Sequence, residues 1–110
     1  MNYRKTRIYQ RSLQLIDFVA KVLKLVRPGY AFLTDELRRS SSSVPLNFLE
    51  GCGRASAADR RRFFNNASGS AHESAGTLDV MTHFGILDEA LCKEGQEICD
   101  HLIAMLRRFR

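Results

Sequence analysis

Arginine is the residue with the clearest chemical potential in this sequence, because its planar guanidinium donates paired hydrogen bonds to phosphate and carboxylate oxygens. Three arginines stand in a row at residues 60–62, and other basic residues gather near both ends of the chain. The predicted phosphate-contacting residues are Arg4, Lys5, Arg7, Arg11, Arg54, Arg60, Arg61, Arg62, Arg107 and Arg108. Such side chains hold the backbone of RNA or DNA but carry little information about base sequence.

The remaining polar residues do not match a catalytic or metal-binding motif. His72, Asp79 and His83 share one helical face by their spacing, but the paired Glu-x-x-His segments of a bundle metal site are missing. Glu97 and His101 have the spacing of a pair on a helix surface. Nucleophile elbows, phosphate-binding glycine loops and zinc knuckles do not occur. We predict no catalytic residue, no metal ligand, no cofactor and no enzymatic activity, with a metal-dependent bundle enzyme as the alternative.

Length and composition indicate one globular domain spanning residues 1–110. Hydrophobic residues make up 45% of the 110 residues, charged residues 26%, and the net charge is +5. Cys92 and Cys99 lie two helical turns apart, too far for a disulfide, and Cys52 is the third cysteine. Reduced thiols, the lack of an apolar leader and the lack of a membrane-length apolar run predict a cytoplasmic protein with no membrane partner.

Apolar periodicity predicts an all-α chain with four helices. The predicted ranges are 6–27, 31–52, 56–84 and 88–109. Ser56 and Asp88 are the expected N-caps of the third and fourth helices, and Gly85 fits the position just after the third. Short connections make neighbouring helices antiparallel, so we predict an up-down-up-down four-helix bundle.

The predicted first helix is apolar around most of its circumference. Its polar residues form one narrow stripe, at Gln14, Asp17, Lys21 and Lys24. A helix of a lone bundle normally exposes about half of its surface, so an additional apolar face points to a second subunit. An apolar helix in a lone monomer is the alternative. The residues predicted to face that subunit are Leu15, Phe18, Val22 and Leu25.

Small residues in the middle of the third helix predict a close helix–helix contact. Gly69 and Gly76 lie on one face, and each costs about 1 kcal/mol relative to alanine inside a helix. We expect close approach of the serine run at residues 40–43 to offset this cost.

The predicted topology brings the start of the first helix, both sides of the second connection and the end of the fourth helix to one end of the bundle. Eleven basic residues, Arg110 included, lie there with only Glu50 and Asp59, which gives a charge of +9 against −4 for the remainder. Arg60, Arg61 and Arg62 stand at a helix start, where the helix dipole disfavours cations. This polarity favours RNA or DNA as a partner. Solvated arginines, or a scaffold that grips an acidic protein, are the alternatives.

Residues 43–54, S-V-P-L-N-F-L-E-G-C-G-R, resemble the S-[IV]-P-x-N-[IF]-x-E-G-x-G-R signature of the bacterial four-helix-bundle proteins. These are also known as the S23 ribosomal protein or rRNA intervening-sequence protein family. The stretches at residues 8–13, 63–64 and 67–73 are similar to other segments of that family. The structural residues that the resemblance marks are Pro45, Asn47, Glu50, Gly51, Gly53, Gly69 and Glu73. We expect Asn47 and Glu50 to satisfy backbone groups near the second connection.

The resemblance implies a four-helix bundle assembled as a homopentameric ring and carries no established catalytic activity. It also implies a relation to the accessory variability proteins of diversity-generating retroelements, which bind nucleic acid and a reverse transcriptase through basic surfaces. The expected partners are therefore further copies of the chain, structured RNA or DNA, and a reverse transcriptase or another protein.

Overall fold

The computed structural model describes residues 2–109. A short 3-10 turn, η1 (Tyr3–Lys5), precedes the α-helices α1 (Arg7–Leu23), α2 (Ala31–Cys52), α3 (Ala57–His83) and α4 (Glu89–Arg108). The four predicted helices are confirmed, but α1 ends four residues earlier than predicted. Pro28 disfavours helical backbone at the residue before it, and the chain after Leu23 tightens into shorter-range bonds such as Leu25 N–H to the Val22 carbonyl, 2.9 Å.

Polar side chains set the helix starts where the sequence predicts them. The Ser56 hydroxyl accepts the Asp59 N–H at 3.1 Å, and the Asp88 carboxylate accepts the Leu91 N–H at 2.8 Å. Each bond satisfies one of the backbone donors that a helix start leaves unpaired. Gly85 follows α3 with φ +77°, a left-handed conformation that glycine adopts without strain.

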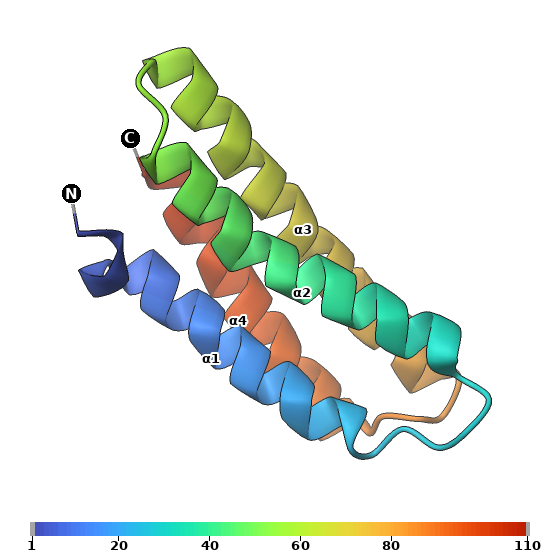
Figure 1. Ribbon diagram of the computed structural model, residues 1–110. Helices are drawn as coiled ribbons and strands as arrows, with labels where there is room; N and C mark the ends of the chain where they lie inside the picture. The colour runs from blue at the N-terminus through green and yellow to red at the C-terminus, as the bar shows by residue number, and fades with distance from the viewer. Residues whose placement is uncertain (1, 110) are drawn as a thin grey trace.

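The helices run antiparallel in chain order, and α1 lies beside both α2 and α4 (Figure 1). The bundle measures 44 × 22 × 18 Å. The N-terminal turn, the α2–α3 connection and the end of α4 lie at one end of the bundle (Figure 1). We call this end the basic pole and the other end, with the α1–α2 and α3–α4 connections, the far pole. Within residues 2–109, none of the helices is long and apolar enough to span a membrane.

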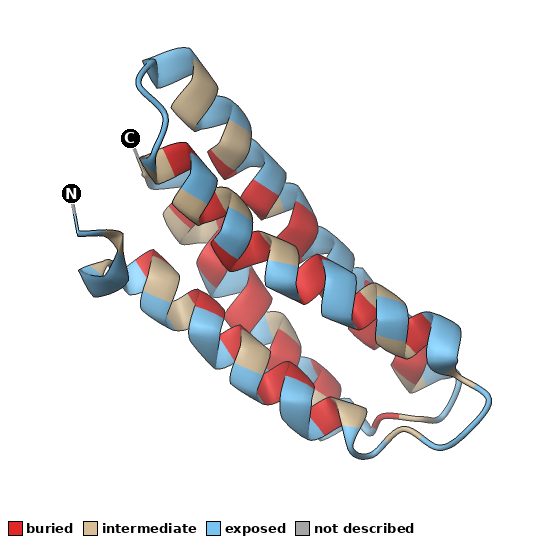
Figure 2. Cartoon of the chain, viewed as in Figure 1, coloured by how far each residue is buried: buried red, intermediate tan, exposed pale blue. Residues whose placement is uncertain are grey.

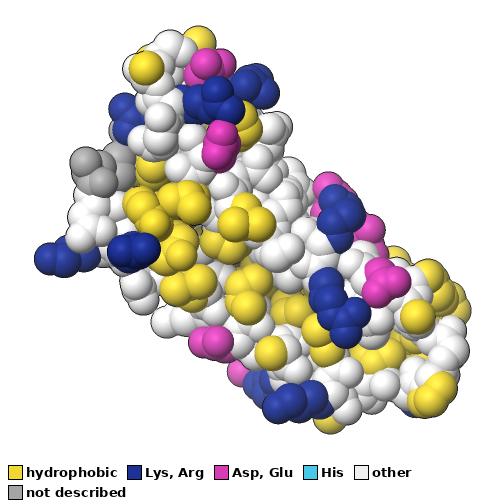
Figure 3. Space-filling model, in the orientation of Figure 1, with side chains coloured by type: hydrophobic (Ala, Val, Ile, Leu, Met, Phe, Trp, Pro, Cys, Tyr) yellow, Lys and Arg dark blue, Asp and Glu magenta, His cyan; other side chains and the backbone are white. Residues whose placement is uncertain are grey.

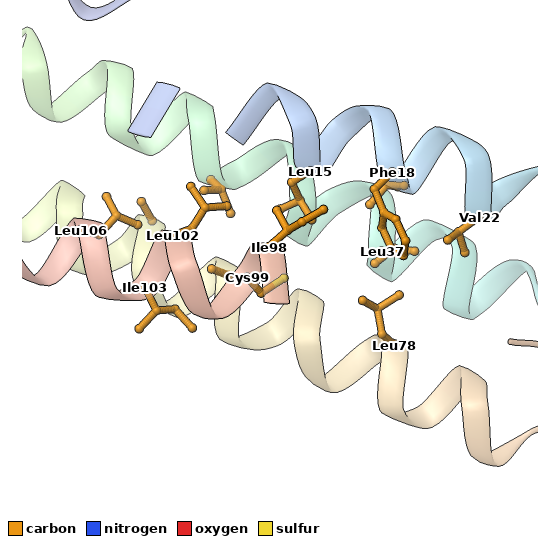
Figure 4. Packing of buried hydrophobic residues seen from close by; sticks show 14 of the residues in the cluster. Leu15, Phe18, Val22, Leu37, Leu78, Ile98, Cys99, Leu102, Ile103 and Leu106 are labelled. Carbon is orange, nitrogen blue, oxygen red and sulfur yellow. The ribbon is translucent and has the colours of Figure 1, made fainter. Parts of the chain in front are cut away.

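The core is an apolar seam to which all four helices contribute. Figure 2 shows the buried residues along the inward faces of the helices, and Figure 4 shows how their side chains meet. Fully buried members include Leu15, Leu37, Phe48, Leu78 and Leu102. Burying each of these side chains contributes about 1.5–3 kcal/mol, so the seam is the main source of stability.

Serines line the contact between α2 and α3. The Ser74 hydroxyl donates to the Ser40 hydroxyl at 2.9 Å, and the Ser70 hydroxyl bonds the Ser43 hydroxyl at 2.8 Å. Ser40, Ser70 and Ser74 are buried. Small side chains allow the two helices to approach closely, and the paired hydroxyls satisfy polar atoms that burial removes from water. The predicted contact between the serine run and α3 is therefore present.

The glycines of this contact do not have the predicted role. A Cβ atom at Gly69 or Gly76 would meet no atom within 4 Å, so both face open space. The close approaches are at Gly95, where a Cβ would lie 2.5 Å from Phe18 Cε2 and also against Leu78, and at Gly51. The prediction for Gly69 and Gly76 is wrong because helical spacing groups residues on a face but does not place the neighbouring helix.

Substituting glycine by alanine should therefore have opposite effects at two helical positions. Gly95→Ala forces Phe18 and Leu78 to shift, and we expect a net loss of about 1–2 kcal/mol in the free energy of unfolding. Gly76→Ala, the matched control, should gain about 0.5–1 kcal/mol from helix propensity alone. Urea unfolding followed by circular dichroism measures both. Equal effects of the two substitutions would contradict the packing described around Gly95.

Candidate functional site

The basic pole gathers the predicted phosphate-contacting residues in space. The N-terminal turn η1 and the first turns of α1 supply Arg4, Lys5, Arg7 and Arg11. The segment from the end of α2 into α3 supplies Arg54, Arg60, Arg61 and Arg62, and the end of α4 supplies Arg107 and Arg108. Figure 3 shows Lys and Arg side chains over this end of the visible face, with few acidic groups among them. Arg110, the eleventh basic residue of the predicted pole, lies outside the described residues.

The two acidic residues of the pole are both used in local ion pairs. Arg54 Nη2 lies 2.7 Å from Glu50 Oε1, and Arg62 Nη2 lies 3.7 Å from Asp59 Oδ1. Within residues 2–109, the other eight basic side chains of the pole form no ion pair. Their charges remain available to an anion from outside the protomer, because nearby carboxylates do not neutralise them.

Phe63 holds two of the arginines in place. The Arg62 guanidinium carbon lies 4.4 Å from the centre of the Phe63 ring, and that of Arg54 lies 4.7 Å from it. Cation–π contacts of this kind at exposed sites contribute about 0.5–1 kcal/mol. Together with the ion pairs, the ring restricts both side chains, so less rotational freedom is lost when they bind a ligand.

Three phenylalanines close the core at the basic pole. Phe109 lies with its ring centre 5.2 Å from those of Phe48 and Phe64, edge to face with both. Phe48 and Phe64 are buried, whereas Phe109 is half-buried and lines a hollow together with Arg60 and Arg61. Phe63 and Phe109 are not among the residues predicted for the site. The signal was present, since an Arg-Arg-Phe sequence occurs at residues 61–63 and again at 107–109.

Within the family signature at residues 43–54, several side chains contact the second half of α2. Asn47 donates to the Ser43 carbonyl at 2.9 Å, one turn back on its own helix. Its predicted contact with the backbone of the connection is therefore wrong, and Glu50 pairs with Arg54 instead. Pro45 is buried, and α2 continues through it. The Phe64 ring packs on the backbone at Gly51, and Gly53 follows the last helical residue.

Glu73 belongs to an ion-pair network that joins α2 to α3. Arg39 binds Glu36 on its own helix, with Nη2 2.7 Å from Oε1, and also binds the Glu73 carboxylate of α3. The hydrogen bond from Arg39 holds the pKa of Glu36 below its usual value, and both carboxylates raise the pKa of Arg39. All three side chains are exposed, so the network adds orientation more than stability. Glu73 therefore links α3 to α2 through Arg39.

Three of the four residues predicted to face a second subunit belong to the core. Leu15, Phe18 and Val22 are at most 5% exposed within the protomer, so they are not available to another chain. Leu25 is 54% exposed but lies beyond the end of α1. The prediction is wrong for these three residues because periodicity identifies more than one apolar row on α1 and does not show which row the bundle covers.

A different row of α1 forms an exposed apolar strip. Leu13 and Ala20 are exposed, and Ile16 and Leu23 are half-buried. Ile16, Val19, Ala20 and Leu23 line a shallow hollow with Arg38, Ser41 and Ser42 of α2. Figure 3 shows hydrophobic side chains along the seam between α1 and α2. We call Leu13, Ile16, Ala20 and Leu23 the apolar strip.

The histidines are not arranged as metal ligands. His83 Nδ1 lies 3.1 Å from the Asp79 carbonyl of its own helix, and the Asp79 carboxylate accepts a 2.5 Å hydrogen bond from Gln96. His72 is exposed elsewhere on α3. Across the part of the chain that the structure describes, no three His, Cys, Asp or Glu side chains are grouped as a metal site.

The cysteines are shielded to different degrees. Burial raises the pKa of the Cys99 thiol to about 12, and the nearby Asp100 carboxylate adds to the shift. Burial also raises the pKa of the half-buried Cys52, while the positive charge of Arg60 opposes that shift. A thiol with a raised pKa is a poor nucleophile at neutral pH, since the thiolate is the reactive form.

The fold and the site define a class: a four-helix bundle with a cationic pole. The family model described as the 23S rRNA-intervening sequence protein matches residues 4–108. The chain therefore belongs to the 23S rRNA-intervening sequence protein family, and the resemblance seen in residues 43–54 is confirmed.

A solved structure has the same fold. It is a protein of unknown function from the S23 ribosomal protein family of Bacteroides thetaiotaomicron VPI-5482, with a TM-score of 0.81 and 20% sequence identity. The similarity covers 90% of this chain and 94% of that one. No functionally curated protein is similar enough to count as a match.

The thiol environments predict an order of chemical labelling. Burial keeps the Cys99 thiol protonated and shielded at pH 8, so iodoacetamide should modify the half-buried Cys52 well before Cys99 in the folded protein. Peptide mass spectrometry over time measures the order. In 6 M guanidinium chloride the two should react at similar rates, which is the control. Equal rates in the folded protein would contradict the burial of Cys99.

Proposed function

We propose that this protein is a non-enzymatic, oligomeric bundle of the bacterial cytoplasm that binds RNA or DNA through its basic pole. The observation that carries the proposal is the set of eight basic side chains of the pole that form no ion pair within residues 2–109. The family description, which refers to 23S rRNA, supports nucleic acid over an acidic protein as the partner.

Phosphate is the chemical group that best fits the pole. Seven of these eight side chains are arginines, whose forked donors match two phosphate oxygens at once. The N-terminus of α3 lies among them, and its unpaired backbone N–H groups add to the attraction for anions. Contacts of this type depend on backbone charge, so we infer binding with little sequence specificity.

We also propose that the apolar strip is an interface between copies of the chain, and that five copies form a ring, as the family resemblance implies. Exposed apolar rows of this kind are covered when subunits associate. Five copies with aligned basic poles would gather about forty-five positive charges on one face, enough to attract a polyanion over several ångströms.

Charge reversal at the pole tests nucleic-acid binding. Replacing Arg60, Arg61 and Arg62 by Glu should weaken binding at least about tenfold and lower the dependence of log affinity on log salt by about two, because Arg60 and Arg61 lose phosphate contacts whereas Arg62 is paired with Asp59. Filter binding of RNA and DNA at several salt concentrations measures both. The matched control replaces Lys24, Arg27 and Lys93, exposed basic residues outside the pole, by Glu.

Two results would contradict this proposal. One is binding that is absent at low salt or does not change with salt. The other is a variant with Glu at positions 60, 61 and 62 that keeps its affinity for nucleic acid but loses a co-purifying acidic protein. That result would favour a scaffold that binds an acidic protein.

Charged substitutions in the apolar strip test the assembly. Leu13 and Ala20 are exposed in the protomer, so Leu13→Glu with Ala20→Glu should leave the fold intact but place carboxylates in the proposed interface. Light scattering should give five times the 12.5 kDa chain mass for the original protein and a lower mass for the variant. Val80→Glu, an exposed apolar position on α3, is the control. A monomeric original protein would contradict the ring.

A further inference from the structure

Three hollows adjoin one another at the basic pole. The first is lined by Arg60, Arg61 and Phe109 among others, the second by Arg7, Arg108 and Phe109, and the third by Arg7 and Arg11 with Gln14 and His101. Phe109 is shared by the first and second hollows, and Arg7 by the second and third. Neighbouring hollows therefore share a lining residue, and together they form a path of adjoining hollows from the start of α3 past the end of α4 to the surface between α1 and α4. We call this path the arginine track.

Every part of the track combines positive charge with a concave surface. Arg11 and Arg7 lie in the α1–α4 groove, Arg108 lies at the end of α4, and Arg60 and Arg61 lie at the start of α3. Neither Glu50 nor Asp59 lines any of the three hollows. A polyanionic chain that follows the track would meet an arginine at each step.

Phe109 gives the track an aromatic surface near its middle. Its ring is held edge to face by Phe48 and Phe64, with both ring centres 5.2 Å away, so its orientation is fixed by the core. The part of Phe109 that remains exposed contributes to the walls of two hollows. Aromatic surface beside guanidinium groups is a combination that proteins use to hold unpaired bases.

Two polar atoms along the track lack an acceptor. Among the described residues, the buried side-chain nitrogens without a hydrogen-bond partner are Arg11 Nε and Arg60 Nε. Arg11 lines the hollow at one end of the track, and Arg60 lines the hollow at the other. Both Nε atoms are buried, so a phosphate on the track would bond the other donors of these two guanidinium groups.

We propose that the arginine track binds single-stranded nucleic acid, with phosphates on its arginines and one unpaired base stacked on Phe109. This inference rests on the proposed function and narrows it from nucleic acid in general to a single strand. The bases of a duplex are paired and stacked on each other, so a duplex would reach only the exposed rim of the track and could not place a base on Phe109.

The test compares a fluorescent 12-nucleotide oligo(dT) with a 12-base-pair DNA duplex, using anisotropy at several salt concentrations. We expect the original protein to bind oligo(dT) at least about fivefold more tightly than the duplex. Phe109→Leu should remove this preference and leave duplex binding unchanged. Phe84→Leu, an exposed phenylalanine at the far pole, is the matched control and should keep the preference.

A second variant keeps the test decisive if Phe109→Leu melts at a much lower temperature. Arg11→Gln should weaken oligo(dT) binding more than duplex binding and lower the salt dependence by about one. Arg27→Gln, which removes an arginine stacked on Tyr30 outside the basic pole, should change neither.

The outcomes separate the two proposals. Three results would overturn the track while leaving binding by the basic pole intact. The first is equal affinity for the two DNAs, and the second is a preference for the single strand that survives Phe109→Leu. The third is an equal loss of affinity for both DNAs in Arg11→Gln. No binding of either DNA at low salt would overturn the proposed function and the track together.

Discussion

Burial of one apolar seam by four antiparallel helices is the constraint on which the rest of this structure depends. The seam fixes which face of each helix points inward, and the short connections then fix which helix ends lie together. Arginines far apart in the sequence, such as Arg7, Arg61 and Arg108, reach the same pole only because the seam aligns the helices in this order. The charge distribution is therefore a consequence of packing.

The concentration of like charge at one pole lowers stability, and local contacts reduce that cost without neutralising the pole. Phe63 stacks with Arg54 and Arg62, which also pair with Glu50 and Asp59, and the end of α4 favours Arg107 and Arg108 through its helix dipole. Elsewhere, Arg38, Arg39 and Lys21 all have carboxylate partners. Half of the six basic residues outside the pole are thus paired with carboxylates, whereas only two of the ten described basic residues of the pole are.

Sequence patterns predicted what depends on neighbouring residues and missed what depends on helix placement. The caps at Ser56 and Asp88 and the turn at Gly85 are local, and they are found where predicted. Which apolar row of α1 is buried, and which glycines touch a neighbour, depend on where α2 and α4 lie, so Leu15 and Gly69 were misassigned. The arginines were predicted as a group, but their arrangement around Phe109 needed the three-dimensional positions of α3 and α4.

The most direct measurement of the central claim is a nuclear magnetic resonance titration of the labelled protein with a short RNA at low salt. If the basic pole is the binding surface, the shifts should concentrate in residues 4–11, 54–64 and 104–109, and diminish as salt is added. The resonances of the far pole, around Phe32 and Phe84, should stay in place. Shifts centred on the far pole, or no shifts at all at low salt, would contradict the account.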